Sequence, residues 1–492
     1  MSSNPQRLYT AAQARELDRI AIEEFGLDGY GLMQRAGLAA FRLLRCRFPR
    51  ARRVRVYCGS GNNGGDGYVL AALALKAGLA VRLAAVGDVK SDAAGKALAA
   101  FRKTGGLPEA FDAGGAPDAD VVIDALLGTG LDRPPAGDYG RAIEQINEAG
   151  RPVLAMDIPS GLHADTGAAL QPCVRADATA TFIGRKLGCF TADGRDAAGV
   201  VHFDDLGVPG EVYQRVNSAA SIIDPHSLAA RVRARPATAH KGDAGRVLIV
   251  GGNRGMPGAP CMAARAAHRS GAGLVYLATR SRPDDLVGST LESMAAEVAS
   301  GAALAPLSSR ADVIAVGPGL GRDDWAAALW QTVLEAGVPM VVDADALSLL
   351  ADNPHRRNDW ILTPHPGEAA RLLGTTAGDV QRDRVAAIRE LRRRYGGVIV
   401  LKGPGTLVLG RSLHLCDRGN PGMASGGMGD VLTGVIAALR GQGLPAEEAA
   451  CYGVWCHGLA GDRAARRGVA GLTAGDLTAA LQGIVGEETE RP

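Results

Sequence analysis

Aromatic side chains, net charge and paired cysteines are all scarce in this sequence. Only 4% of the 492 residues are aromatic, and 54 Lys and Arg against 52 Asp and Glu leave a net charge of +2. So balanced a charge argues against a dedicated nucleic-acid-binding protein, which usually carries a basic excess. The eight cysteines are scattered without a Cys-x-x-Cys pair, which argues against a zinc ribbon and a disulfide framework. We therefore expect buried, reduced thiols in a cytoplasmic protein that does not bind nucleic acid.

A long hydrophobic run is also missing. The first twenty residues carry charges where a signal peptide needs an apolar centre. The most apolar stretch, Val69–Val86, is interrupted by Lys76 and Arg82, so it is too short and too polar to span a bilayer. We expect no membrane partner.

Glycine, by contrast, is abundant. It accounts for 67 of 492 residues, about 14% where ~7% is usual. The 47% share of hydrophobic residues excludes wholesale disorder, and the absence of a three-residue glycine period excludes collagen. Short apolar runs alternate with helical segments, which predicts an α/β fold with a doubly wound parallel sheet.

The alternation occurs twice along the chain. Residues 10–48 read as two helices, with Thr10 and Gln13 as a capping box at the start. The strand and helix pattern then runs on until it lapses over residues 212–240, and it restarts at Arg246. We place the domain boundary near residue 225, which gives domains 1–225 and 226–492.

A glycine-rich loop, Gly59–Gly67, follows the predicted strand Val54–Cys58 and precedes a helix. Glycines there let backbone N–H groups approach a phosphate at the helix N-terminus. The side chains of Asn62, Asn63 and Asp66 add oxygen atoms of the kind that hard cations prefer. The alternative is a purely structural turn in which the asparagines adopt left-handed conformations.

Two aspartates, Asp124 and Asp157, end apolar strands of the first half. Ligands of open α/β sheets bind beyond the carboxyl ends of the strands. The pair could act as acid and base, or one carboxylate could hold a cation. The alternative is that each side chain caps the turn that follows it.

The second half has three further glycine-rich loops, at residues 317–321, 402–406 and 426–430. The last of them opens a helix, so its N–H groups would form an anion hole beside Asp430. A carboxylate there is placed to take a proton during phosphoryl transfer, while Lys402 could pair with phosphate. The alternative for Asp430 is a plain helix N-cap. The sequence holds no Walker A motif.

His365 lies between two prolines in the sequence TPHPGE. A stiff loop suits substrate positioning, although a lone histidine is more often a surface or packed residue.

Taken together, these motifs resemble the bifunctional NAD(P)H-hydrate repair enzymes of bacteria over nearly the whole chain. The matching segments of the first half are LMQRAG (32–37), GNNGGDG (61–67), DALLGTGL (124–131) and DIPSGL (157–162). Those of the second half are HKGDAGRVLIVGG (240–252), GPGLG (317–321), TPHPGE (363–368), LKGPGT (401–406) and GNPGMASGGMGDVLTG (419–434). Ser60 departs from the family, which usually has proline there, and we expect the change to alter loop stiffness more than chemistry.

The resemblance implies that residues 1–225 form a Rossmann-like NAD(P)HX epimerase, which interconverts the two epimers of hydrated NADH and NADPH. The implied substrate-binding residues are Asn62, Asn63, Gly64, Gly65, Asp66, Gly128, Thr129, Gly130, Leu131, Asp132, Arg133, Pro134 and Asp157. The implied ligands of a potassium ion are Asn63, Asp124 and Ser160. Because the cation would occupy Asp124, our hypothesis is that Asp157 moves the proton.

The resemblance also implies that residues 226–492 form a ribokinase-like dehydratase that converts the S epimer to NAD(P)H at the expense of ADP. Asp430 would activate the hydroxyl group, with Mg²⁺ neutralising phosphoryl charge. The implied nucleotide-binding residues are Lys402, Gly403, Pro404, Gly405, Thr406 and Gly429. The implied contacts to the hydrated cofactor are Ala259, Gly319, His365 and Asp430. Members of this family are commonly homo-oligomers, so we expect one here.

Two rival interpretations stay open at this point. The second half could be a ribokinase-like kinase of a vitamin-precursor alcohol, because the GGMGD segment fits both. The first half could be a binding module without activity, although Asn63, Asp124 and Asp157 are all present. The preference for NADHX or NADPHX cannot be read from these motifs, and ADP rather than ATP rests on the resemblance alone.

Overall fold

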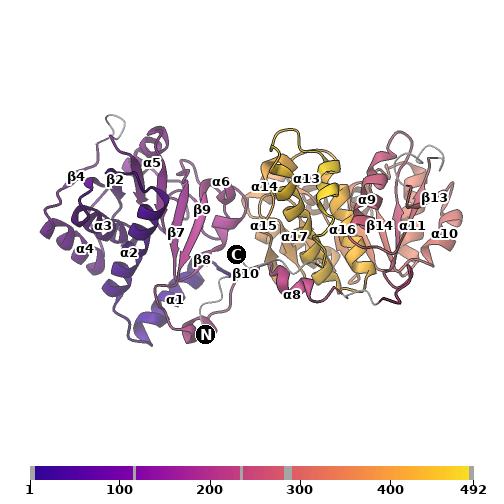
Figure 1. Cartoon of the computed structure of the whole chain (residues 1–492), viewed down its shortest axis with the longest axis horizontal. Helices are drawn as coiled ribbons and strands as arrows, with labels where there is room; N and C mark the ends of the chain where they lie inside the picture. The colour runs from indigo at the N-terminus through magenta and orange to yellow at the C-terminus, as the bar shows by residue number, and fades with distance from the viewer. Residues whose placement is uncertain (1–5, 113, 115–117, 233–236, 282–290, 487–492) are drawn as a thin grey trace. The chain divides into compact units, whose positions relative to one another are not determined.

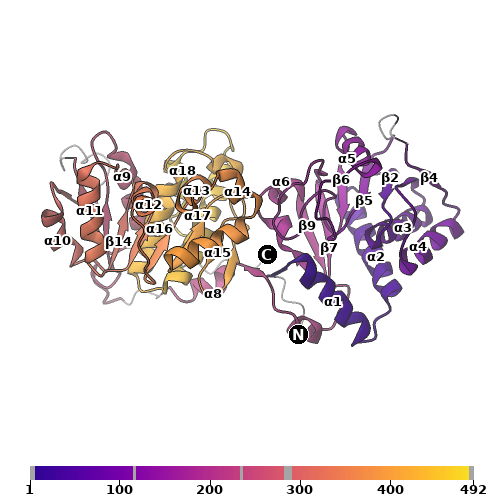
Figure 2. The same cartoon turned by 180° about the vertical axis from the view of Figure 1, so that it is seen from behind.

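The computed structural model describes residues 6–112, 114, 118–232, 237–281 and 291–486. The chain divides into two compact units, Met1–Ser221 and Ile222–Pro492. Figures 1 and 2 show each unit from opposite sides. In both units, strands alternate with helices around a mainly parallel sheet, which confirms the α/β fold class.

The described part of the first unit contains a seven-stranded parallel sheet in the order β4-β3-β2-β5-β6-β7-β9. Its strands are β2 (Arg53–Cys58), β3 (Ala80–Ala85), β4 (Pro108–Ala110), β5 (Val121–Ala125), β6 (Val153–Met156), β7 (Ala178–Phe182) and β9 (Val200–Asp204). A short ladder joins β1 (Arg7–Tyr9) to β10 (Ala220–Ile222) and β8 (Arg185–Lys186). The helices are α1 (Ala11–Glu23), α2 (Gly29–Arg47), α3 (Asn62–Lys76), α4 (Asp92–Lys103), α5 (Asp138–Glu148), η1 (Leu187–Phe190), α6 (Gly194–Ala197) and α7 (Gly210–Arg215).

Each face of this sheet has its own hydrophobic core. Residues of β5 alternate between them, with Val121 and Ile123 in the core beneath α1–α4 and Val122 in the core beneath α5. The capping box predicted for α1 is confirmed, since Gln13 N donates to Thr10 Oγ1 at 3.2 Å and Thr10 N donates to Gln13 Oε1 at 2.9 Å.

The strand order of the first unit reverses between β2 and β5. From β2 the chain passes to β3 on one side and later to β5 on the other, which creates a topological switch point. The loops after these two strands approach so closely that a Cβ atom on Gly59 would lie 1.9 Å from the carbonyl oxygen of Leu126. Only glycine fits there, and the crevice at this edge is where the first site forms.

The second unit contains strands in the order β13-β12-β11-β14-β15-β16-β17-β18-β19. All pairs from β13 to β17 are parallel, and the last two are antiparallel hairpins. The strands are β11 (Arg246–Val250), β12 (Leu274–Thr279), β13 (Met294–Glu297), β14 (Val313–Val316), β15 (Met340–Val342), β16 (Trp360–Leu362), β17 (Val398–Leu401), β18 (Leu407–Leu409) and β19 (Leu413–Leu415). The helices are α8 (Pro225–Ala229), α9 (Gly258–Arg269), α10 (Gly301–Ser308), α11 (Asp324–Glu335), α12 (Ala344–Asp352), α13 (Pro366–Leu373), α14 (Ala377–Arg382), α15 (Arg384–Tyr395), η3 (Pro421–Met423), α16 (Met428–Gly441), α17 (Ala446–Ala465) and α18 (Ala474–Ala480).

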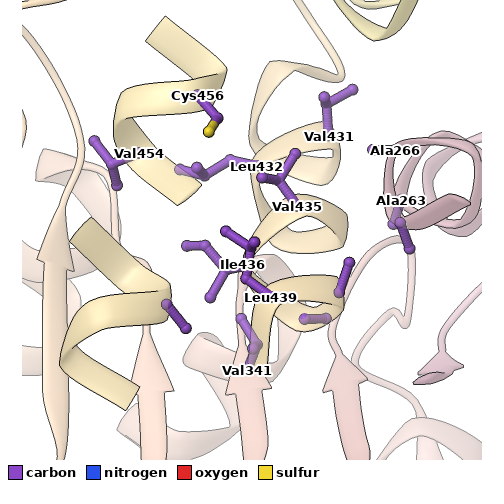
Figure 3. Close-up of a cluster of buried hydrophobic side chains, with 14 of the residues drawn as sticks. Ala263, Ala266, Val341, Val431, Leu432, Val435, Ile436, Leu439, Val454 and Cys456 are labelled. Carbon is purple, nitrogen blue, oxygen red and sulfur yellow. The ribbon is translucent and has the colours of Figure 1, made fainter. Parts of the chain in front are cut away.

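Helix α16 is the centre of the second unit's core. Figure 3 shows Leu432, Val435 and Ile436 among side chains of α9, α17 and the sheet, including Val341 of β15. Because α16 is buried on most sides, its first turn is held rigidly above the carboxyl ends of the strands.

Two expectations about the whole chain can be compared with the structure. All eight cysteines are free thiols, and seven are buried. The expectation of buried thiols is wrong for Cys46, which is exposed near the end of α2. No helix in the described parts of the chain is long and apolar enough to cross a membrane.

Candidate active sites

A cavity of about 510 Å³ lies at the switch point of the first unit. Its wall includes eight of the predicted substrate residues: Asn62, Asn63, Asp66, Gly128, Thr129, Gly130, Leu131 and Asp157. Asp132, Arg133 and Pro134 continue the loop of Gly128 beyond that wall.

Gly64 and Gly65 lie behind the cavity wall, in the first turn of α3. A Cβ atom on Gly64 would meet the carbonyl oxygen of Gly59 at 2.0 Å, and one on Gly65 would meet Met33 Cε at 2.5 Å. Both positions therefore need glycine for close packing of the loop.

The three predicted cation ligands are linked by hydrogen bonds, since Asn63 donates to Leu127 O, Leu127 N donates to Ser160 Oγ, and Ser160 donates to Asp124. Asp124 is fully buried, and its carboxylate accepts from Ser160 Oγ at 2.6 Å and from Ser160 N at 2.8 Å. Burial, partly offset by these bonds, raises the pKa of Asp124 to about 6. Asn63 donates from its amide to Leu127 O at 2.9 Å, while its buried Oδ1 has no hydrogen-bond partner.

These observations fit a bound monovalent cation. A buried carboxylate without a cationic neighbour is costly, and an unpartnered amide oxygen beside it is a ready ligand. Hard cations take oxygen ligands, which Asn63, Asp124 and Ser160 all supply. Asp124 also caps the turn that follows it, because Leu126 N donates to its Oδ1 at 3.2 Å.

Asp157 adopts an unusual backbone conformation at the end of β6. Its φ of 64° lies in the left-handed region, which residues other than glycine rarely occupy. Its carboxylate forms an ion pair with Lys186 and also accepts from Phe182 N at 3.3 Å. Strain of this kind persists where neighbouring contacts hold it, and it is often found at functional sites.

Asp18 of α1 and Lys186 of β8 are among the cavity residues that could not be predicted from the sequence. Lys186 is almost fully buried and is the cation of a cluster with Asp18, Asp66 and Asp157. Neither residue belongs to a motif, and both reach the cavity through tertiary packing, since β8 packs against β7 and α1 packs against β8.

Asp430 is the third residue of α16, and the N-cap of that helix is Gly427, with a φ of 86°. The side chain of Asp430 therefore does not cap the helix. Burial is the main reason why the pKa of Asp430 is raised to about 7, and the nearby carboxylates of Asp343 and Asp345 add to it. A carboxyl group with this pKa can exchange a proton near neutral pH.

A buried ion cluster lies beside Asp430. Lys402 Nζ lies 2.7 Å from Asp343 Oδ1 and 3.7 Å from Glu368 Oε2, and Thr433 Oγ1 donates to Asp343 Oδ2 at 2.7 Å. Burial opposes the charge of Lys402, but Asp343 and Glu368 together raise its pKa. Sequence reasoning missed Asp343, although it ends a strand just as Asp124 and Asp157 do.

Three of the predicted contacts to the hydrated cofactor, Ala259, Gly319 and His365, come from the segments that follow β11, β14 and β16. Gly319 has a φ of 59°, and a Cβ atom there would lie 3.4 Å from Ala259 Cβ, so the loops after β11 and β14 meet at these residues. His365 is the N-cap of α13 rather than part of a loop, and its Nδ1 accepts from Gly367 N at 2.9 Å. Pro366 and Glu368 complete this helix start, and the imidazole ring is largely exposed.

The loop that follows β17 is held by a buried arginine. Arg384 donates to Leu401 O at 3.1 Å and to Lys402 O at 3.2 Å. Its burial lowers its pKa to about 10. Gly403 needs to be glycine, because its φ is 131° and a Cβ atom would lie 2.9 Å from Arg384 Nη1. Gly429 of α16 lies close to the same loop, because a Cβ atom added to Gly429 would lie 3.2 Å from Lys402 Nζ.

Comparisons with known proteins match part of each unit to a known family. A family model described as YjeF-related protein N-terminus matches residues 29–188, and one described as NAD(P)H-hydrate dehydratase matches residues 247–483. The bifunctional NAD(P)H-hydrate repair enzyme Nnr of Coxiella burnetii is 45% identical over 488 residues, which cover 97% of this chain and 99% of that protein.

Solved structures resemble the second unit. A ribokinase-like superfamily protein of Enterococcus faecalis is 29% identical with a TM-score of 0.50, covering 53% of this chain and 93% of that one. An ADP/ATP-dependent NAD(P)H-hydrate dehydratase of Bacillus subtilis, co-crystallised with ATP and Mg²⁺, is 28% identical with a TM-score of 0.49, covering 54% of this chain and 96% of that one. The first of these confirms the ribokinase-like fold. Because the Coxiella enzyme is similar to this chain over nearly its whole length, and because both family models match, this chain belongs to the family of bifunctional NAD(P)H-hydrate repair enzymes.

Proposed function

We propose that the two units carry out consecutive steps of the repair. Residues 1–225 interconvert the R and S epimers of hydrated NADH and NADPH, and residues 226–492 dehydrate the S epimer at the expense of ADP. The observation that carries the proposal is that Asp157 lines a cavity with seven other predicted substrate residues, while Asp430 lies beside Lys402 and the strand-end carboxylate of Asp343.

In the first unit, the start of α3 (Asn62–Asp66) and the loop Gly128–Pro134 bind the hydrated cofactor. Their backbone N–H groups and the N-terminus of α3 suit its phosphate groups. Asp157 lies in the same cavity, where its carboxylate can take a proton from the hydrate. Asp124 is too deeply buried for that role, since none of its surface is exposed.

Asn63, Asp124 and Ser160 are the residues that would hold potassium. The ion would neutralise the buried Asp124 carboxylate and so stabilise the loops that form one side of the cavity. The support for this assignment is the unpartnered Oδ1 of Asn63, whose side chain is linked to Asp124 through Leu127 and Ser160.

In the second unit, Asp430 takes the proton of the substrate hydroxyl group as its oxygen attacks the terminal phosphoryl group of ADP. Departure of the resulting phosphate group, with loss of a ring proton, then restores the nicotinamide. The first turn of α16 has unpaired N–H groups that can stabilise the phosphoryl oxygens. Ala259, Gly319 and His365 would contact the hydrated ring.

Lys402–Thr406 and Gly429 would bind the nucleotide. Among the described residues, no group of three or more His, Cys, Asp and Glu side chains is arranged to hold a metal ion. Mg²⁺ would therefore be held mainly by the nucleotide phosphates, as is common for this ion. A homo-oligomeric state belongs to the same proposal, and light scattering tests it.

The test is an assay of both NADHX epimers with Mg²⁺, K⁺ and either ADP or ATP, in which the absorbance of reduced nicotinamide is followed. Full recovery with ADP supports both halves of the proposal, because the R epimer has to be converted before it is dehydrated. Recovery that stalls with one epimer left contradicts the epimerase assignment. Absence of recovery with either nucleotide contradicts the dehydratase assignment.

Two substitutions assign the steps to the units. Asp157→Asn is expected to stop recovery once the S epimer is consumed, and Asp430→Asn to prevent recovery while the epimers still interconvert. Asp138→Asn is the matched control for the first, since Asp138 is an exposed partner of Arg141 on α5. Epimer exchange at the normal rate in Asp157→Asn would rule out its role.

A further inference from the structure

We infer that Asp18 is the second proton-transfer residue of the epimerase cavity, acting opposite Asp157, which Lys186 holds in place. The inference rests on the proposed epimerase function and adds a catalytic residue and a positioning residue to it. Neither belongs to a motif of the sequence. Both line the same cavity as Asp157.

The chemistry of the substrate calls for two such groups. The carbon that differs between the epimers bears a hydroxyl group and is bonded to the ring nitrogen. If a base removes the hydroxyl proton, the C=O double bond forms and the electron pair of the C–N bond passes to nitrogen, which an acid then protonates. Rotation of the resulting aldehyde exposes its other face, and the reverse transfers close the ring in the opposite configuration. No oxidant or other reactant is consumed, and both residues return to their starting protonation states.

The contacts of Lys186 fix Asp157 as the base. The ammonium group forms an ion pair with Asp157 Oδ1, donates to Phe182 O at 3.0 Å and lies 3.3 Å from Thr181 Oγ1. With 3% of its surface exposed, Lys186 is almost fully withdrawn from bulk water. Among the residues that the structure describes, the hydrogen bonds to the Asp157 carboxylate all go to Oδ1. Its Oδ2 is therefore available to accept the hydroxyl proton.

Asp18 reaches the cavity from a different element, helix α1. The other titratable groups of the wall are Arg15, Asp66, Asp157, Lys186 and Tyr139. Burial raises the pKa of Asp18 to about 6. The positive charge of Lys186 opposes this rise in pKa, and the negative charge of Asp157 adds to it. The two carboxyl groups thus differ in environment, since one is ion-paired and the other is not, which is the pattern expected of a base and an acid.

Asp66 is the competing third carboxyl group. Burial, followed by Asp157 and Asp18, raises its pKa well above the usual range, and it also faces Cys58 in the interior. An acid held neutral so strongly donates a hydrogen bond but gives up its proton reluctantly. Asp18, with its pKa nearer to the working pH, is better suited to reversible transfer.

The test measures interconversion of separated R and S NADHX by chromatography, with the full chain, K⁺ and no nucleotide, across a range of pH. For the wild type, the rate is expected to fall as the pH rises through about 6, because the acid form of Asp18 is needed. Asp18→Asn is expected to lower the rate by about 100-fold or more and to remove this decline. Asp18→Glu is expected to keep a measurable rate with the decline at a different pH.

The matched control is Glu16→Gln, which changes an exposed carboxylate on the same helix, paired with Arg19. Its rate and pH profile are expected to equal those of the wild type. Dehydration of pure S epimer with ADP, measured in every variant, reports the second unit independently.

Three outcomes would overturn the inference: a wild-type rate in Asp18→Asn, a lower rate with the same decline near pH 6, or an unchanged profile in Asp18→Glu. If Asp18→Asn fails to fold, as judged by circular dichroism, the profile of Asp18→Glu decides alone. A wild-type chain that does not interconvert the epimers at all contradicts the proposed epimerase function instead, so the two failures are distinct.

Discussion

The ammonium group of Lys402 lies 2.7 Å from Oδ1 of Asp343, and only 1% of Asp343 is exposed. The pair joins the loop after β17 to the end of β15, next to the first turn of α16. A buried carboxylate of this kind depends on its partner. Lys402 is therefore part of the fold of this unit as well as of its proposed nucleotide site.

Removal of that partner is expected to destabilise the second unit strongly. Lys402→Met leaves the Asp343 carboxylate buried and without a counter-ion, which should lower the free energy of unfolding by about 3–5 kcal/mol. Urea unfolding followed by tryptophan fluorescence measures this unit alone, because Trp325, Trp330, Trp360 and Trp455 all lie in it.

Two controls accompany this measurement. The double variant Lys402→Met/Asp343→Asn removes the unpaired charge and is expected to recover part of the loss. Arg382→Met breaks an exposed ion pair with Asp379 in the same unit and should leave the transition unchanged. An unaltered transition in Lys402→Met would show that the pair does not stabilise the fold.

Dehydration is expected to depend on the ionisation of Asp430. Its pKa of about 7, raised mainly by burial, means that the carboxylate form needed to accept a proton is lost as the pH falls below 7. The value of kcat on pure S epimer should therefore fall about tenfold per pH unit below that point and level off above it.

The substitution Asp345→Asn is expected to shift this dependence of kcat on pH in a defined direction. The charge of Asp345 is one of the causes that raise the pKa of Asp430, so its removal should move the acidic decline to lower pH. Asp324→Asn, on the first turn of α11, is the matched control. A decline at the same pH in wild type and Asp345→Asn would contradict the assignment of this decline to Asp430.

Local signals in the sequence were enough to predict the architecture and several residues of the first cavity. Strand ends followed by glycine-rich loops indicated Asn62, Asn63, Asp66 and Asp157, which line it, because parallel strands end at one edge of a sheet. The binding role of Gly128–Leu131 came from the family resemblance. Asp18 and Lys186 carried no such signal. Asp18 lies on an amphipathic helix and Lys186 on a two-residue strand, and only tertiary packing brings them to Asp157.

At His365, the secondary structure expected from the sequence was wrong. Its two flanking prolines suggested a stiff loop, whereas the structure begins a helix there. Pro366 at the first helical position and Glu368 two residues later are start signals in their own right. The expectation of a stiff loop took no account of these two helix-start signals.

Potassium is expected to stabilise the first unit against heat. An ion held by Asn63, Asp124 and Ser160 binds only the folded state, so its addition at about 100 times its dissociation constant contributes ~2.7 kcal/mol. Calorimetry in KCl and in tetramethylammonium chloride of equal concentration separates this effect from ionic strength. Asp124→Asn should remove the difference, while Asp138→Asn keeps it. Equal transitions of the wild type in both salts would contradict the cation site.

The loop after β17 offers the sharpest test of nucleotide binding. Gly403→Ala places a Cβ atom 2.9 Å from Arg384 Nη1 at a φ of 131°, which an alanine rarely adopts. Strain of about 1–3 kcal/mol displaces the loop, so the KM for ADP should rise at least fivefold. Epimer interconversion should stay unchanged. Gly443→Ala, with a φ of 95° but no atom within 4 Å of the new Cβ, imposes strain away from this loop and should leave the KM for ADP unaltered. Because both variants strain the backbone and only one displaces Arg384, an equal KM in the two would show that residues 402–406 do not bind the nucleotide.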